Sequence, residues 1–307
     1  MLVSFIIPAH NEESTIGALI GTIQQYVSLP FEILVIDNGS SDRTAKIASA
    51  LGVQLIQLEH KTSPSIVRNA GAKQARGDLL VFLDGDTRVT PEWAQTLQAN
   101  AQGMIDQPMI LTGARVVTPD PQECSWIEKY WFAPMAQEPA NYINGANIIT
   151  TPQAFAAIGG MNETLATGED YDFSQRAKAS GVRLVPEARY RLIHDGYPKT
   201  IADFYRRERW HGKGDASDFR TILRSKVALL SLAFILTTSL CIVSLIFFSG
   251  KATLAWLALT LAMPAACALA RFRNNGSRTL FAAFALYSIY LAARGVTTIT
   301  QPFKEST

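Results

Sequence analysis

The longest uncharged stretch of the sequence covers residues 227–249, which read VALLSLAFILTTSLCIVSLIFFS. A helix of about 20 apolar residues crosses the roughly 30 Å hydrocarbon core of a bilayer. A second uncharged run covers residues 252–270 and contains Pro264, which a membrane helix tolerates. A third begins at residue 279 and continues weakly past Arg294. We therefore predict a membrane domain over residues 227–300 with about three helices, at 227–249, 252–270 and 279–300.

The third run allows two arrangements, because Arg294 interrupts it before it reaches the length of a full span. The helix crosses the bilayer if the Arg294 side chain snorkels to a membrane interface, and otherwise it lies partly in the membrane plane. We favour crossing. A buried helical core in a soluble protein is the weaker alternative, since it does not explain three successive apolar runs with basic flanks.

Basic residues flank these runs unevenly and predict an orientation. Residues 199–226 carry eight Lys and Arg against four Asp and Glu, and residues 271–278 carry three Arg, whereas only Lys251 separates the first two runs. Cytoplasmic loops are rich in Lys and Arg, so residues 1–226 and 271–278 are expected in the cytoplasm. The start, MLVSFIIPAHNEE, lacks the basic region of a signal peptide. We predict a multi-pass protein of a bacterial cytoplasmic (inner) membrane, with residues 199–226 as a basic amphipathic interfacial segment.

The charge balance of the remaining chain excludes some classes of function. Residues 1–198 carry 14 Lys and Arg against 21 Asp and Glu, so nucleic-acid binding is not expected. The 48% hydrophobic content fills a core and excludes a disordered chain. Three cysteines have neither zinc-site nor disulfide spacing, and we expect them to be inert: Cys124, Cys241 and Cys267.

The N-terminal part alternates between predicted strands and helices, which favours a mostly parallel sheet with helices on both faces. Ligands of such sheets bind beyond the carboxyl ends of the strands. Polar residues follow three of the predicted strands at that edge, so we expect a small-molecule site there. They are His10, Asn11 and Glu12, then Asp37 and Asn38, then Asp84 and Asp86. The predicted strands cover residues 3–9, 31–37, 53–58 and 78–84, and the predicted helices 12–26, 44–51, 64–75 and 91–101.

Six short motifs follow one another along the chain: PAHNEE at 8–13, IDNGSSDRT at 36–44, RNAG at 68–71, LDGDT at 83–87, GGMNE at 159–163 and GEDYD at 168–172. Together they resemble the family 2 glycosyltransferases over about residues 2–215. The resemblance implies a GT-A fold, a Rossmann-like α/β fold with a mostly parallel mixed sheet, followed here by C-terminal transmembrane helices. It also implies a cytoplasmic catalytic domain over residues 1–198, with a nucleotide-sugar half at about 1–105 and an acceptor half at about 106–198, and inversion at the anomeric carbon.

Asp84 and Asp86 are two carboxylates at one strand end, which together can hold a divalent cation. Hard oxygen ligands and a phosphate partner favour Mg²⁺ or Mn²⁺. Such a metal acts as a Lewis acid on a departing diphosphate. The resemblance implies that Asp86 is the more direct metal ligand, that Asp84 lies near the ribose and the metal, and that His194 is a candidate third ligand. A structural histidine is the alternative for His194.

The resemblance also assigns the residues that bind the nucleotide. Asp37 is expected to accept a hydrogen bond from the base imide, and Asn38 stands where many members have a second acid. We expect Arg68 to contact the base or the diphosphate. The residues expected to line the base pocket are Pro8, His10 and Glu12.

An inverting transfer needs one carboxylate to remove the proton of the acceptor hydroxyl. Asp170 is our candidate for this base, and Glu169 is expected to be its neighbour in the acceptor site. Both begin a predicted helix, whose N-terminus should keep Asp170 ionised. Asp172 is expected to be a surface acid only.

Residues 206–210, RRERW, resemble the Gln-x-x-Arg-Trp motif of processive members, but Arg206 replaces the Gln. Arg209 and Trp210 are expected to close over the diphosphate and the acceptor. The alternative is an amphipathic helix that turns Phe204, Tyr205 and Trp210 toward lipid. One segment can serve both roles.

The sequence thus predicts a metal-dependent, inverting glycosyltransferase of cell-envelope polysaccharide or glycolipid synthesis. It would move one sugar from a UDP- or GDP-sugar to a hydroxyl acceptor, a lipid or a lipid-linked glycan, at the inner leaflet. A polyprenyl-phosphate sugar transferase and a processive polysaccharide synthase are the alternatives, and a non-catalytic membrane scaffold is the least favoured. Specificity is expected to lie in loops such as the aromatic-rich residues 113–145.

Overall fold

The computed structural model describes residues 1–137, 141–247 and 250–301. Residues 138–140, within the predicted acceptor half, and 248–249, at the end of the first apolar run, lie outside the described residues. The chain divides into two compact units, each made of two segments. The first unit is Met1–Asp120 with Glu138–Tyr197, and the second is Pro121–Gln137 with Pro198–Thr307.

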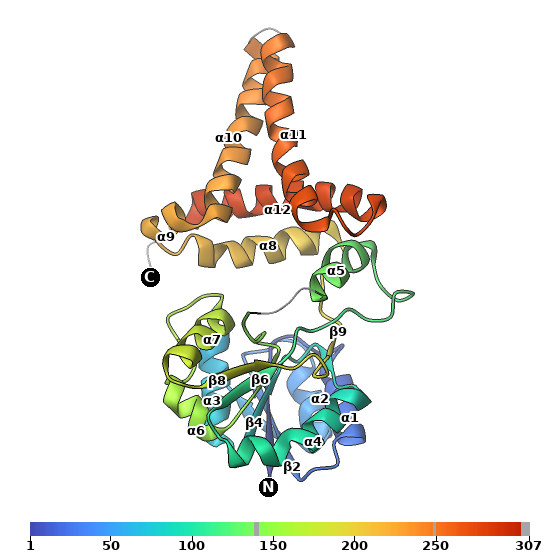
Figure 1. The fold of residues 1–307 in the computed structure, drawn as a ribbon, viewed down its shortest axis with the longest axis vertical. Helices are drawn as coiled ribbons and strands as arrows, with labels where there is room; N and C mark the ends of the chain where they lie inside the picture. The colour runs from blue at the N-terminus through green and yellow to red at the C-terminus, as the bar shows by residue number, and fades with distance from the viewer. Residues whose placement is uncertain (138–140, 248–249, 302–307) are drawn as a thin grey trace. The chain divides into compact units, whose positions relative to one another are not determined.

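A seven-stranded sheet organises the first unit (Figure 1). Four neighbours, in the order β3-β2-β1-β4, run parallel. β7 runs antiparallel to both β4 and β6, and β6 runs parallel to β8. The predicted mixed, mostly parallel α/β sheet is therefore confirmed. Its strands are β1 (Val3–Ala9), β2 (Phe31–Asp37), β3 (Gln54–Gln57), β4 (Leu79–Leu83), β6 (Ile110–Gly113), β7 (Asn147–Thr150) and β8 (Arg183–Pro186), and a separate pair joins β5 (Thr87–Arg88) to β9 (Ile193–His194).

Helices cover both faces of this sheet because successive strand residues point to opposite sides. Phe5 and Ile7 enter the hydrophobic core on one face, whereas Ile6 enters the core on the other. Each face therefore needs its own layer of helices. The first is covered by α1 (Ile16–Tyr26), α2 (Thr44–Ala50) and α4 (Pro91–Asp106), and the second by α3 (Pro64–Gln74), α6 (Pro152–Ile158) and α7 (Glu169–Ala179).

Two helices differ in length from the prediction. α1 begins at Ile16 rather than at Glu12, because the Glu12 carbonyl instead closes a turn with the backbone N–H of Thr15. Asn11 precedes this turn with a φ of 60°. α4 continues past the predicted end to Asp106, since Met104 adds a further buried contact to the core.

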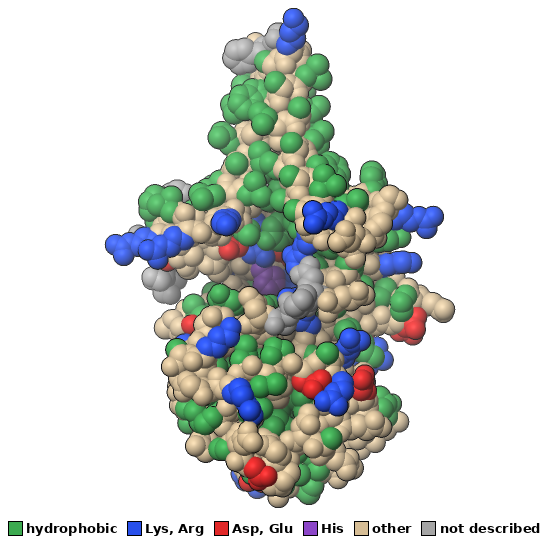
Figure 2. All heavy atoms as spheres, viewed as in Figure 1, with side chains coloured by type: hydrophobic (Ala, Val, Ile, Leu, Met, Phe, Trp, Pro, Cys, Tyr) green, Lys and Arg blue, Asp and Glu red, His purple; other side chains and the backbone are tan. Residues whose placement is uncertain are grey.

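The second unit is helical, and three of its helices are long and apolar enough to cross a membrane by length and composition. In Figure 1, α10 and α11 lie side by side as a hairpin. Hydrophobic side chains cover this hairpin, and Lys and Arg gather near α8 and α9 (Figure 2). The helices are η1 (Glu128–Phe132), α5 (Ala133–Ala136), α8 (Ile201–Asp215), α9 (Phe219–Arg224), α10 (Lys226–Phe247), α11 (Gly250–Phe272) and α12 (Ser277–Thr300).

α12 runs across the α10–α11 hairpin rather than alongside it (Figure 1). Its Arg294 side chain pairs with two carboxylates. It donates to Glu208 Oε2 at 2.8 and 3.1 Å and to Asp215 Oδ2 at 2.6 Å, and both carboxylates belong to α8. α12 is long and apolar enough to cross a membrane by length and composition, so crossing by this run stays a prediction.

The segment 121–137 joins the second unit through an aromatic cluster. The Trp131 ring centroid lies 5.3 Å from that of Phe204 and 4.7 Å from that of Tyr287. Phe204 is fully buried, so the expectation that this side chain faces lipid is wrong. Trp210 does point outward and is 40% exposed.

Candidate functional site

The small β5–β9 pair brings Asp86 against His194. In this pair Thr87 lies opposite His194. Asp86 Oδ2 lies 3.5 Å from His194 Nε2, and the Asp86 carbonyl accepts a hydrogen bond from the Asp195 backbone N–H at 2.8 Å. Two residues that the sequence predicted as metal ligands therefore meet at the carboxyl edge of the sheet.

Gly196 is required for this close approach. A Cβ at position 196 would lie 1.7 Å from Asp86 Oδ2, far inside van der Waals contact. The neighbouring Asp195 is held by Arg88, whose Nε and Nη2 donate to its two carboxylate oxygens at 2.6 and 2.9 Å. Such bidentate pairs fix geometry strongly. The sequence did not identify Gly196 or this ion pair, although the His194-Asp195-Gly196 run offered a turn signal.

Asp86 and His194 each keep one buried polar atom unpaired. Within the described ranges, Asp86 Oδ1 and His194 Nδ1 have no hydrogen-bond partner. Burial raises the pKa of Asp86, and the nearby His194 opposes that rise. Among the described residues, no three His, Cys, Asp or Glu side chains are gathered closely enough to bind one metal ion. The predicted set of Asp84, Asp86 and His194 is thus not gathered as a three-ligand site among these residues, and Arg68 holds one carboxylate oxygen of Asp84.

Arg68 engages Asp84 and connects it to the start of α7. Its Nη2 donates to Asp84 Oδ1 at 2.6 Å and its Nη1 donates to Glu169 Oε1 at 2.8 Å. The Arg68 side chain is only 4% exposed. The two carboxylates keep the pKa of Arg68 above its usual range despite its burial. One buried guanidinium therefore joins the end of β4 to the beginning of α7, a contact that no local sequence pattern predicts.

Asp170 follows Glu169 at the start of α7 and accepts a hydrogen bond from the Gly145 backbone N–H at 3.0 Å. Burial and the negative charge of Glu169 raise the pKa of Asp170 to about 6. At neutral pH this carboxyl is still mostly ionised, although its pKa lies above the usual range of an aspartate. A side chain at Gly145 would press on both Arg68 and Asp170.

Glu12 lies over the turn that contains Gly85. A Cβ at Gly85 would lie 3.1 Å from Glu12 Cγ and 3.4 Å from the Pro8 carbonyl oxygen. Burial, and next the charge of Asp86, raises the pKa of Glu12 to about 7. Pro8 and Glu12 thus pack directly against the Asp84–Asp86 turn.

The end of β2 presents the other predicted nucleotide-binding residues. Asp37 is buried and accepts a hydrogen bond from the Ser40 backbone N–H at 3.2 Å. The Asn38 side chain binds the backbone of Thr62 through both its oxygen and its nitrogen. His10 Nδ1 lies 3.0 Å from the Asn38 carbonyl oxygen. These contacts hold the strand end and the following loop together.

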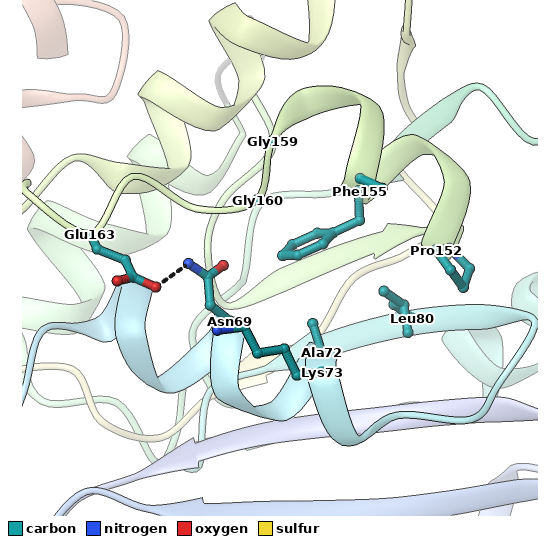
Figure 3. A pocket seen from close by; sticks show the side chains of 10 residues that line it. Asn69, Ala72, Lys73, Leu80, Pro152, Phe155, Gly159, Gly160 and Glu163 are labelled. Atoms are coloured by element: carbon teal, nitrogen blue, oxygen red, sulfur yellow. Dashed lines mark hydrogen bonds between the residues drawn. The ribbon is translucent and has the colours of Figure 1, made fainter.

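Asn69, the residue after Arg68, holds the GGMNE loop. Its Nδ2 donates to the Met161 carbonyl and to Glu163 Oε1, and its Oδ1 accepts from the Met161 backbone N–H, at 2.8 to 2.9 Å. Beside this clamp lies an open pocket of about 430 Å³, where Phe155 projects between α6 and α3 (Figure 3). Neither Asp86 nor His194 lines this pocket.

Asp172 has a larger role than the surface acid that we expected. It pairs with Arg176 at 2.7 Å. Arg176 Nη1 then donates to the carbonyls of Ile158 and Gly160, each at 2.7 Å. Asp172 therefore supports the loop before α7.

Arg209 and Trp210 belong to α8 in the second unit. Arg209 donates to the hydroxyls of Thr297 and Thr300, each at 3.3 Å, and so contacts α12. Arg206 pairs with Asp203 on the same helix. Their expected closure over the diphosphate and the acceptor stays a prediction.

The part of the chain that contains these residues is similar in sequence to known glycosyltransferases. A sequence model of glycosyl transferase family 2 matches residues 4–158. The chain is 31% identical over 185 residues to an uncharacterized glycosyltransferase of Haemophilus influenzae, covering 56% of this chain and 60% of that protein. It is 28% identical over 195 residues to the glycosyltransferase AglE of Haloferax volcanii, covering 59% and 63%. The chain therefore spans less than two thirds of the length of these curated relatives.

A solved structure is similar over nearly the whole chain. It is the mannosyltransferase PcManGT from Pyrobaculum calidifontis in complex with GDP-Man and Mn²⁺, with a TM-score of 0.63 and 18% identity. The alignment covers 97% of this chain and 87% of that one. At this identity the likeness concerns the fold, and the predicted GT-A fold is confirmed.

Proposed function

The chain belongs to glycosyl transferase family 2, and from this premise we propose that it is a membrane-anchored, metal-dependent, inverting glycosyltransferase. It moves one sugar from a nucleoside-diphosphate sugar, a UDP- or GDP-sugar, to a hydroxyl acceptor. The acceptor is a lipid or a lipid-linked glycan at the inner leaflet of a bacterial cytoplasmic membrane. The neighbour that binds GDP-Man supports a nucleotide-sugar donor.

The observation that carries this proposal is the Arg68 bridge. It joins Asp84, on the proposed donor side, to Glu169, which precedes the proposed base Asp170. A transfer reaction requires donor and acceptor groups to be held in one geometry. Such positioning supplies a large part of the rate enhancement of enzymes. A shared buried guanidinium is a means to fix that geometry.

The chemistry of Asp86 and His194 fits a divalent cation, Mg²⁺ or Mn²⁺, since each has a buried polar atom without a partner among the described residues. When bound, the cation neutralises charge on the departing diphosphate. Asp84 lies beside this pair, with its Oδ1 engaged by Arg68. The Mn²⁺ of the mannosyltransferase neighbour supports this assignment.

Asp170 acts as the general base. Its pKa of about 6 leaves the carboxylate mostly ionised at neutral pH while keeping it basic enough to accept a proton. Oδ2 accepts from the Gly145 backbone N–H and Oδ1 from the Tyr171 backbone N–H at 2.8 Å. These two hydrogen bonds orient the carboxylate toward one position of the acceptor hydroxyl.

The α10–α11 hairpin serves as the membrane anchor. Its outward side chains are large and apolar, and Leu236, Leu245 and Leu254 are more than half exposed. Contiguous exposed apolar surface of this extent marks a membrane or protein contact. We assign α12 to the interface rather than to a third span, because of its pairing with α8 through Arg294.

The test is nucleoside-diphosphate release by the full chain, purified in detergent and assayed with a panel of nucleotide sugars. Each donor is assayed with Mn²⁺, with Mg²⁺ and with EDTA. We expect release with one donor that needs the metal and is lost in Asp170→Asn and Asp86→Ala. Asp106→Asn, an exposed acid at the end of α4, is the matched control and should keep full activity.

A phosphate acceptor would give a different pattern. A polyprenyl-phosphate needs no base, so Asp170→Asn would then keep its turnover while Asp86→Ala loses it. Absence of nucleotide binding to the wild-type chain, measured with UDP and GDP by calorimetry, would contradict the donor site itself.

A further inference from the structure

An apolar pocket of about 520 Å³ lies within the second unit, between the segment before η1 and the first turns of α12. Its volume is in the range of small-molecule sites. Large aromatic side chains line it together with small residues that leave room beside α12. The lining includes Trp126, Tyr130, Arg278, Phe281, Ala282 and Ala285.

Its rings are turned outward rather than packed into a core. The exposed fraction is 77% for Phe281 and 40% for Trp126. Other rings of the same segment behave differently, since Trp131 and Phe132 are buried. The outward rings therefore do not complete the core of this unit, and they offer an apolar surface to something outside it.

Positive charge lies at the rim of the pocket. Arg278 lines it directly, and the ammonium of Lys129 lies 5.8 Å from the centre of the Tyr130 ring. The first turns of α12, residues 277–285, carry no Asp or Glu beside Arg278. The ligand that this rim complements carries a negative charge next to an apolar body.

Aromatic and basic residues at the end of a membrane helix mark the level of the lipid headgroups. Basic pockets between such helices bind the phosphates of anionic lipids. We propose that this pocket holds an anionic phospholipid, with one acyl chain against Trp126 and Phe281 and its headgroup phosphate on Arg278. The inference rests on the membrane anchoring in the proposed function, but it does not depend on catalysis.

The probe is phosphatidylglycerol with a photoreactive diazirine on one acyl chain, mixed into nanodiscs that contain the full-length chain. Phosphatidylcholine with the same diazirine is the comparison probe. After illumination, the labelled peptides are quantified by mass spectrometry. We expect label from phosphatidylglycerol to concentrate on residues 126–130 and 278–285 and to exceed label from phosphatidylcholine there.

Variants separate the headgroup contact from the acyl-chain contact. Arg278→Gln should lower the phosphatidylglycerol label about fivefold, the effect of one basic residue near an anionic surface, whereas Arg273→Gln, which does not line the pocket, should change it little. Ala285→Phe fills the pocket and should remove label from both probes. Ala258→Phe, on the exposed side of α11, is its control and should leave the label unchanged.

Each failure has its own meaning. If the chain does not co-purify with nanodiscs, both the anchoring and this inference are overturned. If it does co-purify, three results overturn only the lipid site: label spread evenly over α10 and α11, equal label from the two probes, or equal losses in Arg278→Gln and Arg273→Gln. Thermal unfolding of each variant in the same discs excludes loss of label through misfolding.

Discussion

Each unit of this protein contains a buried arginine that bridges two carboxylates from another part of the chain. In the first unit Arg68 pairs with Asp84 and Glu169, and in the second Arg294 pairs with Glu208 and Asp215. The bridges look alike in distance, from 2.6 to 2.8 Å, and both guanidinium groups are mostly buried. Their surroundings differ.

Around Arg294 the charges balance. A second cation, Arg207, lies 3.0 Å from Glu208, and the Tyr290 ring lies 4.9 Å from the Arg294 guanidinium. Around Arg68 negative charge is in excess, because the charge of Asp170 also acts on Arg68 beside those of Asp84 and Glu169. Burial, and next the charge of neighbouring carboxylates, raises the pKa of Asp170 to about 6 and that of Glu12 to about 7.

By this difference we interpret the Arg294 cluster as a structural contact and the Arg68 cluster as part of the proposed reaction site. A balanced ionic cluster holds two helices together, whereas carboxylates kept close to one another at a free-energy cost are typical of sites that bind cations or transfer protons. A buried salt bridge alone is weak evidence for either role.

Asp170→Asn should have the largest effect of these variants, a loss of the transfer rate. Losing a general base lowers the transfer rate by about 10²- to 10⁴-fold. Nucleotide binding should persist, since Asp170 is placed on the acceptor side. Rates come from nucleoside-diphosphate release and affinities from calorimetry, and Asp106→Asn serves as the unchanged control. Wild-type rates in Asp170→Asn would remove Asp170 from the mechanism.

Removing either arginine should destabilise the protein by a similar amount but with different functional effects. Arg68→Gln leaves Asp84 and Glu169 without their cation, and Arg294→Gln leaves Asp215 without its cation and Glu208 with Arg207 alone. Each loss costs up to about 3–5 kcal/mol. Hydrogen exchange should then rise at β4 and α7 for Arg68→Gln, and at α8 and α12 for Arg294→Gln. Only Arg68→Gln should lose nucleotide binding. Equal loss in both variants would erase the distinction between the two clusters.

Gly196→Ala tests whether Asp86 binds the metal ion. A Cβ 1.7 Å from Asp86 Oδ2 must displace that carboxylate, so the affinity for Mn²⁺ in the presence of nucleotide should fall by about tenfold, the equivalent of roughly 1.4 kcal/mol. Gly103→Ala, where a Cβ meets no atom within 4 Å, should leave it unchanged. Equal affinities in the two variants would place the metal away from Asp86.

As pH falls toward 5, the transfer rate should fall, whereas the contribution of Asp170 to the free energy of unfolding of the first unit should rise. The transfer rate should fall about tenfold per pH unit below the Asp170 pKa of about 6, because the protonated carboxyl accepts no proton. Between pH 3.8, the ordinary pKa of an aspartate, and about pH 6, the folded state binds more protons at Asp170 than the unfolded state. The free energy of unfolding therefore rises as pH falls through this range. Asp170→Asn should lack this gain when both chains are unfolded thermally from pH 7 to 5. An identical pH dependence would contradict the assignment.

The strand-end residues were predictable because the carboxyl ends of parallel strands always meet at one edge. The alternation of strands and helices along the sequence therefore predicts that Asp37 and Asp86 share one edge of the sheet. The Arg68–Glu169 contact was not predictable, since its partners lie on separate helices and neither has a local signal. The same holds for Gly196, whose need for a missing side chain appears only once Asp86 is opposite.

In the second unit, length and composition identified the apolar helices but not their direction. α12 satisfies the same hydropathy rule as α10, yet its partners on α8 turn it across the hairpin. Burial of Phe204 was missed for a related reason: its cover, Trp131, comes from a segment that the sequence assigned to the acceptor half.

Residues 121–137 belong to the second unit but are synthesised before most of it, and this order matters for biogenesis. Trp131 leaves the ribosome long before Tyr287 and Tyr290, the rings that cover it. At about 5–20 residues per second, the delay is roughly 10–30 s. During this time the first unit can complete its sheet around a loop whose own partners do not yet exist. Chaperones and the insertion machinery therefore meet a nascent chain that displays an uncovered aromatic loop, and a gene shortened after residue 197 would leave that loop uncovered permanently.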